Sequence, residues 1–275
     1  MQDKLWYYLR YEKKSVAGWL QRIDAEMIGS ILTFQRQHNI SGSCVEIGVH
    51  HGKSFIPLCM ALKSSEQALC IDLFDDQKKN LDSSGKGDFY AFKKNIEKHG
   101  IDFSMIRILK GSSEDVKPDD ILAQVGPVRF FSVDGGHWKS IVQNDLILAE
   151  KTLSAEGVIA LDDYCRAEWP DVTYGYSLWQ NDTKSDIIPF AVGSNKLYLC
   201  RKEYVQKYRA ALKGPFLRQY FTKSYHTDGA VIDCYRLEPY NQDEESATNA
   251  ILLSFGIFRP DMFITLKNWL RKIRK

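Results

Sequence analysis

Two short acidic segments carry the clearest chemistry in this sequence. The segment VDGGH contains Asp134 and His137, and the segment LDDY contains Asp162 and Asp163. Each follows an apolar run typical of a buried strand. Three carboxylates that converge repel one another unless a cation joins them, and all-oxygen ligation suits a hard ion such as Mg²⁺ or Mn²⁺. We therefore predict that Asp134, Asp162 and Asp163 are metal ligands, with helix capping as the alternative role for any single aspartate.

His137 follows Asp134 by three residues and is expected to reach the same site. A neutral imidazole with a pKa near 6.5 can accept a proton at physiological pH. His137 is thus the candidate general base, and Asp134 and His137 are the two candidate catalytic residues. The remaining histidines lack such a position, and we interpret them as structural or solvated.

A glycine-containing turn is the second candidate site. In EIGVHHGKS, Glu46 lies near the end of a predicted strand, Gly48 and Gly52 follow that strand, and Ser54 begins a predicted helix. Glycines let backbone approach a ligand there, and the N–H groups at the start of the helix face it. The spacing matches neither a dinucleotide-binding fingerprint nor a phosphate-binding loop. Two ordinary tight-turn glycines are the alternative interpretation.

Two carboxylates adjoin this turn. Glu46 ends a buried strand and therefore needs a hydrogen-bonding partner, either a ligand or neighbouring backbone. Asp72 ends the next strand, where a carboxylate can accept both hydroxyls of a ribose. Together they indicate a nucleoside ligand without a pyrophosphate.

An alternation of strands and helices is expected to position these residues. Strands are predicted over 43–47, 67–72, 105–109, 128–133 and 157–161, and helices over 16–38, 54–62, 88–99, 114–125 and 140–153. Such alternation specifies a parallel sheet covered on both faces, with ligands beyond the carboxyl ends of its strands. Beyond residue 163 the pattern loosens: 169–171 is predicted as loop, 196–200 and 230–237 as strands, and 241–275 as mainly helical.

Length and composition indicate one domain with additions. The 275 residues divide into an N-terminal helical segment (1–40), a core (41–200) and a C-terminal extension with the last strands and a basic terminal helix (201–275). A net charge of +2 is too small for the basic field of a general nucleic-acid binder, so no nucleic-acid partner is expected. A homo-oligomer is compatible with the sequence.

The cysteines and the absence of leader-like segments bear on location. The six cysteines include no C-x-x-C pair, which favours a reducing compartment. The first residues lack the apolar stretch of a signal peptide, and no window is apolar enough to span a membrane, so we expect a cytoplasmic protein. The basic segment 267–275 could lie on an anionic membrane, but we favour docking of its apolar face on the domain.

Five segments in order resemble the class I S-adenosylmethionine-dependent methyltransferases, in particular the metal-dependent branch with macrocin and other macrolide-sugar O-methyltransferases and cephalosporin hydroxylase-like proteins. The resemblance covers roughly 17–200 and lies in GWLQRIDAEMIGSILTFQRQHNISGSCVEIGVHHGKSF, CIDLFDDQKKNLDSSGKGD, GSSEDV, FFSVDGGHWKSIVQNDLILAE and GVIALDDYCRAEWPDV.

This resemblance implies a Rossmann-like, doubly wound and mostly parallel seven-stranded α/β sheet with N- and C-terminal helical additions. S-adenosylmethionine would lie over the first turn, with Asp72 on the ribose. The implied cofactor-binding residues are Glu46, Gly48, Gly52 and Ser54 near the methionine part, Asp134 beside it, and Phe74, Ser112, Ser113 and Glu114 around the adenine. In metal-dependent relatives the corresponding acids hold Mg²⁺. Some relatives carry a further acidic residue at the position that Gly136 occupies here. Because glycine has no side chain that could accept a proton, the role of general base is left to His137.

The implied function is Mg²⁺-dependent O-methylation of a sugar or glycosylated small molecule, such as a natural product or a surface glycan. A catechol would chelate the same ion and is an alternative acceptor. Two competing functions are a non-catalytic nucleoside-binding module and a hydrolase or hydroxylase with the same metal. The acceptor would be shaped by the aromatic residues 6–8, the segment 169–179 and the C-terminal helices.

Overall fold

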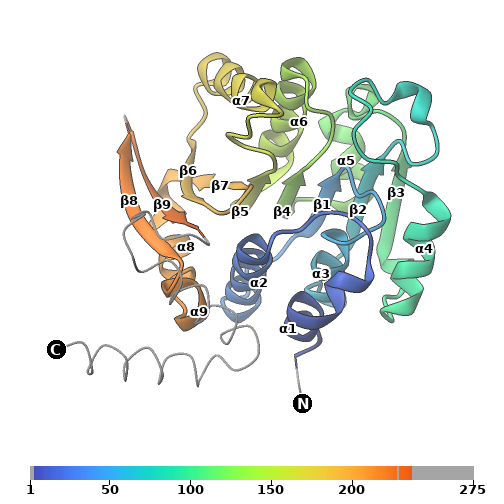
Figure 1. Cartoon of the computed structure of the whole chain (residues 1–275), viewed down its shortest axis with the longest axis horizontal. Coiled ribbons are helices and arrows are strands. Elements are labelled where there is room, and N and C mark those ends of the chain that lie inside the picture. The colour runs from blue at the N-terminus through green and yellow to red at the C-terminus, as the bar shows by residue number, and fades with distance from the viewer. Residues whose placement is uncertain (1–2, 228, 237–275) are drawn as a thin grey trace, which may run out of the picture.

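The computed structural model describes residues 3–227 and 229–236, which form one mixed sheet between two layers of helices (Figure 1). The sheet order is β3-β2-β1-β4-β5-β7-β6-β9-β8. Its strands are β1 (Ser43–Ile47), β2 (Ala68–Asp72), β3 (Ile106–Lys110), β4 (Val128–Val133), β5 (Leu153–Leu161), β6 (Ile187–Val192), β7 (Leu197–Arg201), β8 (Phe221–Thr227) and β9 (Ala230–Tyr235).

The strand order places a reversal beside the predicted site. Strands β1 to β5 pair in parallel, and β1 has β2 on one side and β4 on the other. Helical connections from β1 and β4 therefore leave in opposite directions and open a crevice at their carboxyl ends. Strand β7 runs antiparallel to β5, so the beginning of β7 lies beside the end of β5.

The expected α/β sheet is confirmed, with nine strands in the described part where seven were predicted. The seven-stranded unit corresponds to β1–β7, and the β8–β9 hairpin extends it at the β6 edge. Neither β6 nor β8 was predicted. Pro189 within β6 argues against a strand in the sequence, and β8 is mostly exposed and lacks an apolar face.

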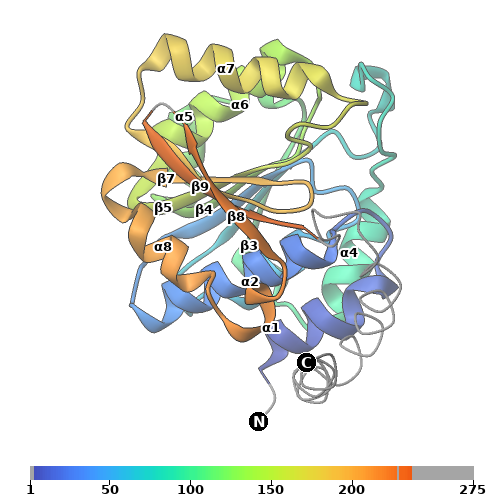
Figure 2. The same ribbon diagram turned by 60° about the vertical axis from the view of Figure 1, so that its left-hand side comes forward.

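Helices cover both faces of the sheet (Figure 2). They are α1 (Lys4–Tyr7), α2 (Arg22–Gln37), α3 (Phe55–Met60), α4 (Phe89–Lys98), α5 (Pro118–Val125), α6 (Lys139–Thr152), α7 (Pro170–Thr183), α8 (Val205–Ala211) and α9 (Pro215–Arg218). Apolar side chains of α1–α4, α8 and α9 pack on one face, and those of α5–α7 pack on the other. The central strands are therefore buried on both sides, and β1 has no exposed residue, whereas the edge strand β8 is mostly exposed.

Several predicted boundaries move. The predicted loop at 169–171 is wrong for Pro170 and Asp171, which begin α7, because Pro170 takes the first position of a helix, where its missing N–H costs nothing. Helix α2 begins only at Arg22, and the predicted helix 114–125 divides into a 3₁₀ turn at Ser113–Asp115 and α5. The predicted basic terminal helix lies outside the described residues. In the described ranges, no helix combines the length and apolarity that a membrane crossing requires.

Candidate active site

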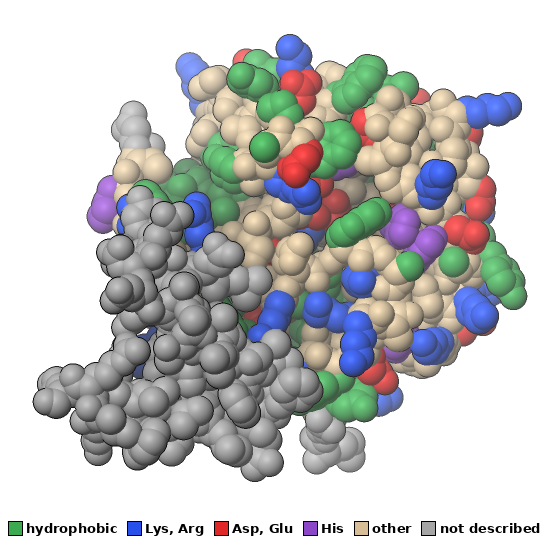
Figure 3. All heavy atoms as spheres, viewed as in Figure 1, with side chains coloured by type: hydrophobic (Ala, Val, Ile, Leu, Met, Phe, Trp, Pro, Cys, Tyr) green, Lys and Arg blue, Asp and Glu red, His purple; other side chains and the backbone are tan. Residues whose placement is uncertain are grey.

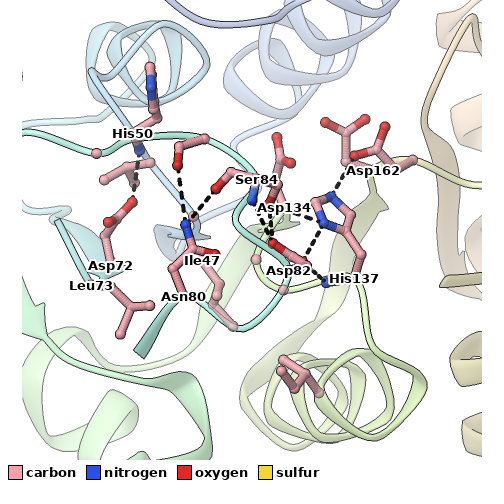
Figure 4. A pocket seen from close by; sticks show the side chains of 18 of the residues that line it. Ile47, His50, Asp72, Leu73, Asn80, Asp82, Ser84, Asp134, His137 and Asp162 are labelled. Atoms are coloured by element: carbon pink, nitrogen blue, oxygen red, sulfur yellow. Dashed lines mark hydrogen bonds and ion pairs between the residues drawn. The ribbon is translucent and has the colours of Figure 1, made fainter. Parts of the chain in front are cut away.

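A cavity of about 460 Å³ lies at the carboxyl ends of the parallel strands. The space-filling view shows a hollow with acidic side chains inside it (Figure 3). In the close-up, Asp72 and Leu73 lie at one end, and Asp134, His137 and Asp162 lie at the other (Figure 4). The predicted residues that line the cavity are Gly48, Ser54, Asp72, Ser112, Ser113, Glu114, Asp134, His137, Asp162 and Asp163. One cavity thus joins the two candidate sites.

The turn after β1 is locked against the end of β4. Gly48 has φ +81°, and a Cβ there would lie 1.7 Å from the carbonyl oxygen of Asp134. The Asp134 N–H donates to the Ile47 carbonyl at 3.0 Å. Gly52, at φ +89°, closes the same turn through a hydrogen bond from its N–H to the Val49 carbonyl, but it does not line the cavity. The close approach explains why glycine is needed at position 48.

Asp72 organises the backbone around the turn. Its carboxylate accepts hydrogen bonds from the N–H groups of His50 and Phe74, and both of these residues have positive φ, 51° and 48°. Non-glycine residues in that region are strained and cluster at functional sites. Burial raises the pKa of Asp72, although the two backbone N–H groups oppose the shift. The carboxylate lies on the cavity wall, where a ribose diol could still reach it.

Around the predicted adenine position, one residue differs from expectation. Ser112, Ser113 and Glu114 line the cavity, but Phe74 does not. The Phe74 ring is fully buried in the apolar layer below α4, where it packs against Phe89 and Phe92 at centroid distances of 5.2 and 5.4 Å. Its neighbour Leu73 lines the cavity instead.

Glu46 also lies away from the cavity. Its side chain is fully buried, and neither carboxyl oxygen has a hydrogen-bond partner in the described part of the chain. Burial raises the pKa of Glu46 to about 7, and the nearby charge of Lys196 opposes that shift only in part. Glu46 therefore lies beneath the turn that follows β1 and does not line the cavity.

The three aspartates come together as predicted. One carboxylate oxygen from each of Asp134, Asp162 and Asp163 lies within 4.8 Å of the others. They follow β4 and β5, whose residues Val133 and Leu161 are paired in register. Burial and the adjacent Asp162 raise the pKa of Asp134 well above its ordinary value. Asp163 has φ +54°, a further strained position at the site.

Lys196 brings a cation into this cluster. Its side chain is only 2% exposed, and Nζ lies 2.7 Å from Asp162 Oδ2 and 3.3 Å from Asp134 Oδ2. Next to it, the Asn195 amide donates to Oδ1 of both Asp162 and Asp163 at 2.7 and 2.9 Å. Burial lowers the pKa of Lys196, but the charges of Asp134 and Asp162 outweigh burial and raise it.

His137 is held between Asp163 of this cluster and one further carboxylate, Asp82. Nδ1 lies 2.7 Å from Asp82 Oδ2, Nε2 lies 2.9 Å from Asp163 Oδ2, and the ring stacks on Trp169 with centroids 4.1 Å apart. Burial lowers the pKa of His137, but the hydrogen bonds to Asp163 and Asp82 raise it to about 9. In this arrangement the imidazole is protonated near neutral pH. It can act as a base only when Nε2 leaves Asp163.

Sequence reasoning missed Asp82, Asn195 and Lys196, and it named Trp169 only as part of the segment expected to shape the acceptor site. Asp82 comes from the irregular connection between β2 and α4, which has no recognisable pattern. Lys196 begins a predicted strand and Asn195 directly precedes it, and an antiparallel direction for that strand would have placed them beside Asp162 and Asp163. The observed pairing of Leu161 with Leu197 does so.

Comparison with known proteins agrees with this geometry. Residues 45–164 match a family model described as a methyltransferase domain, and no curated protein is similar enough in sequence to count as a match. Among solved structures, the O-methyltransferase NovP is 17% identical with a TM-score of 0.56, over 67% of this chain and 83% of NovP. CalS11, a TDP-rhamnose 3'-O-methyltransferase of calicheamicin biosynthesis, is 16% identical with a TM-score of 0.48, over 66% of this chain and 82% of CalS11. An O-methyltransferase from Bacillus cereus in complex with SAH is 15% identical with a TM-score of 0.47, over 72% of this chain and 90% of that chain.

The strand order, the glycine turn against β4 and the carboxylate at the end of β2 define a Rossmann-like methyltransferase fold. The match of residues 45–164 to the methyltransferase-domain model agrees with this fold and indicates a methyltransferase.

Proposed function

We propose that this protein transfers the methyl group of S-adenosylmethionine to a hydroxyl of a sugar or glycosylated small molecule, with help from a bound Mg²⁺ or Mn²⁺. The observation that carries the proposal is the single cavity with the glycine turn and Asp72 at one end and three convergent aspartates at the other. A donor in the first part would present its methyl group to a hydroxyl held in the second.

The donor half of the cavity is built for a nucleoside. Asp72 offers carboxylate lone pairs to the ribose, and Gly48 lets the methionine part approach the backbone of the turn. Ser112, Ser113 and Glu114 provide polar groups along the adenine side. In the proposed function these groups would hold the donor and fix the direction of its methyl group, and positioning of this kind can lower a barrier by about 7–11 kcal/mol at best.

The acid cluster has the donor set of a hard cation. Asp134, Asp162 and Asp163 offer three carboxylate oxygens within 4.8 Å of one another, and these three residues would hold such an ion. When bound, such an ion would polarise the acceptor hydroxyl and favour its deprotonation. The residues also have partners of their own in the chain, since Lys196 pairs with Asp134 and Asp162, and Asp163 pairs with His137 and Arg166.

Proton transfer is the proposed role of His137. Its Nε2 points at Asp163, so a hydroxyl that approaches the aspartates also approaches the imidazole. Asp82 keeps the ring in place through Nδ1, and Trp169 covers one face of the ring. With Nε2 free of Asp163, the neutral ring would accept the hydroxyl proton at that atom.

The lining of the cavity favours a polyhydroxylated acceptor. Trp169, Arg166 and Glu168 line it, with Trp169 stacked on His137, and Trp19, which is 68% exposed, lines it beside His50. Aromatic faces together with charged hydrogen-bonding groups suit a sugar ring better than a purely apolar substrate. A catechol remains the alternative acceptor, because it would also present two adjacent hydroxyls.

The test is methyl transfer from donor labelled with ¹³C in the methyl group to a panel of glycosides and catechols, with Mg²⁺ or with EDTA. We expect a mass increase on a glycoside that depends on the divalent ion. Asp162→Asn should abolish most of it, and the exposed Asp186→Asn should not. A labelled catechol would correct the acceptor class. Donor binding by calorimetry without transfer to any acceptor would indicate a non-catalytic module, and incorporation of oxygen or water would indicate a different reaction.

A further inference from the structure

Lys196 is a buried cation at the centre of the acidic cluster. Lysine side chains are almost never fully buried unless they are paired, and this one has two carboxylate partners at 2.7 and 3.3 Å. Those partners, Asp162 and Asp134, follow two different strands. The ammonium group therefore joins the ends of β5 and β4 from within the protein.

The fold delivers Lys196 to this place through a pinned turn between β6 and β7. Asp24 of α2 accepts hydrogen bonds from the Asn195 N–H at 3.0 Å and from the Tyr198 hydroxyl at 3.1 Å. A Cβ at Gly193 would lie 2.0 Å from Asp24 Oδ1, so the turn sits tightly on α2. Lys196 thus comes from a fixed backbone rather than from a loose surface loop.

We propose that Lys196 is the resident cation of the acidic cluster, which holds Asp134 and Asp162 together without a divalent ion and competes with such an ion for the same two carboxylates. This rests on the metal-binding part of the proposed function. Lys196 is a positioning residue here, and it sets how tightly a metal binds.

The ion pairs of the cluster show at which aspartates Lys196 competes with a metal ion. Asp163 is paired with His137 and Arg166 rather than with Lys196. Lys196 therefore opposes metal binding at two of the three aspartates, through occupied oxygens and through repulsion between like charges. A buried charge that loses its partner is costly, so Asp134 and Asp162 should repel each other when Lys196 is removed, and a divalent ion should then relieve that repulsion.

The test compares metal affinity in the wild type, Lys196→Met and Lys196→Gln. The probe is Mn²⁺ alone, titrated by calorimetry and by electron paramagnetic resonance, after circular dichroism and S-adenosylhomocysteine binding have shown that each variant is folded. We expect both variants to bind Mn²⁺ at least about tenfold more tightly than the wild type. Lys202→Met, on the exposed surface beyond β7, is the matched control and should bind like the wild type.

A second readout keeps the proposal testable if the variants are unstable. In EDTA both Lys196 variants should melt at a lower temperature than the wild type, and saturating Mn²⁺ should raise their melting temperatures more than that of the wild type. Equal or weaker Mn²⁺ binding by folded variants would overturn the proposal. So would a lower melting temperature that Mn²⁺ does not restore.

The outcomes also separate this inference from the proposed function. Mn²⁺ binding by the variants but not by the wild type would support the role of Lys196 and contradict metal-assisted transfer by the native enzyme. Absence of Mn²⁺ binding in all proteins would overturn both metal proposals. An assay of methyl transfer by the wild type in EDTA tests the transfer reaction itself, apart from metal assistance and apart from the role of Lys196.

Discussion

Replacement of Gly48 by alanine tests the contact that joins the donor turn to the metal end of the site. Two costs follow from the structure. The residue has φ +81°, a conformation that costs an L-residue about 1–2 kcal/mol. The added Cβ would also meet the Asp134 carbonyl oxygen at 1.7 Å, where ordinary contact begins at 3.4 Å. Relief of such an overlap by backbone movement typically costs about 1–3 kcal/mol.

Gly100→Ala provides the matched control. Gly100 has φ +67°, but a Cβ there would meet no atom of the described residues within 4 Å, so this variant carries the conformational cost alone, about 1–2 kcal/mol. Gly48→Ala should lose about 2–5 kcal/mol of unfolding free energy. Because the overlap moves the turn or Asp134, its affinity for S-adenosylhomocysteine should also fall at least about tenfold, whereas Gly100→Ala should bind normally.

Urea unfolding and calorimetric titration with S-adenosylhomocysteine measure the two quantities. A Gly48→Ala protein no less stable than Gly100→Ala would show that the turn is not locked against β4. Unchanged nucleoside affinity in a destabilised Gly48→Ala protein would show that this turn does not hold the donor.

Three further predictions concern single carboxylates and the candidate base. Burial raises the pKa of Asp145 to about 7. The folded state therefore binds the carboxyl proton of Asp145 more tightly than the unfolded state does. As a result, the free energy of unfolding of the wild type falls as pH rises towards 7. From pH 5 to pH 8, the free energy of unfolding of Asp145→Asn, measured with urea, should therefore rise by about 2–3 kcal/mol relative to that of the wild type. An equal difference at both pH values would contradict the shift. Asp72→Ala should weaken S-adenosylhomocysteine binding about 100-fold in calorimetry, since two charged hydrogen bonds to the ribose are lost, while the exposed Asp75→Ala should bind like the wild type. Asp162→Asn should slow methyl transfer more than His137→Gln, for which a loss of about 10²–10⁴-fold is expected, and the reverse order at saturating Mg²⁺ would refute the role assignment.

The sequence predicts the parts of this site that regular elements deliver. Asp134 and Asp162 each follow an apolar strand, and parallel strands end at one edge, so their convergence could be predicted without coordinates. The turn at Gly48 and the carboxylate of Asp72 follow from the same rule. Their positions depend on local patterns that a single sequence displays.

The parts that the sequence did not predict depend on strand direction and on irregular backbone. Lys196 reaches the aspartates because β7 runs antiparallel to β5, and the residues before β7 carry no sign of that direction. Asp82 holds His137 from an irregular connection, which changes the protonation state expected for the base. Phe74 has a positive φ, and its side chain is buried in the apolar layer. A phenylalanine in the sequence does not predict such a backbone conformation.

The most direct test of the account is a crystal structure with S-adenosylhomocysteine and Mn²⁺, in which anomalous scattering locates the ion. We predict that the ribose lies on Asp72, that the sulfur lies beside the turn at Gly48, and that the Mn²⁺ peak lies among Asp134, Asp162 and Asp163. A nucleoside bound elsewhere, or an ion bound away from the three aspartates, would contradict the arrangement on which the proposed methyl transfer depends.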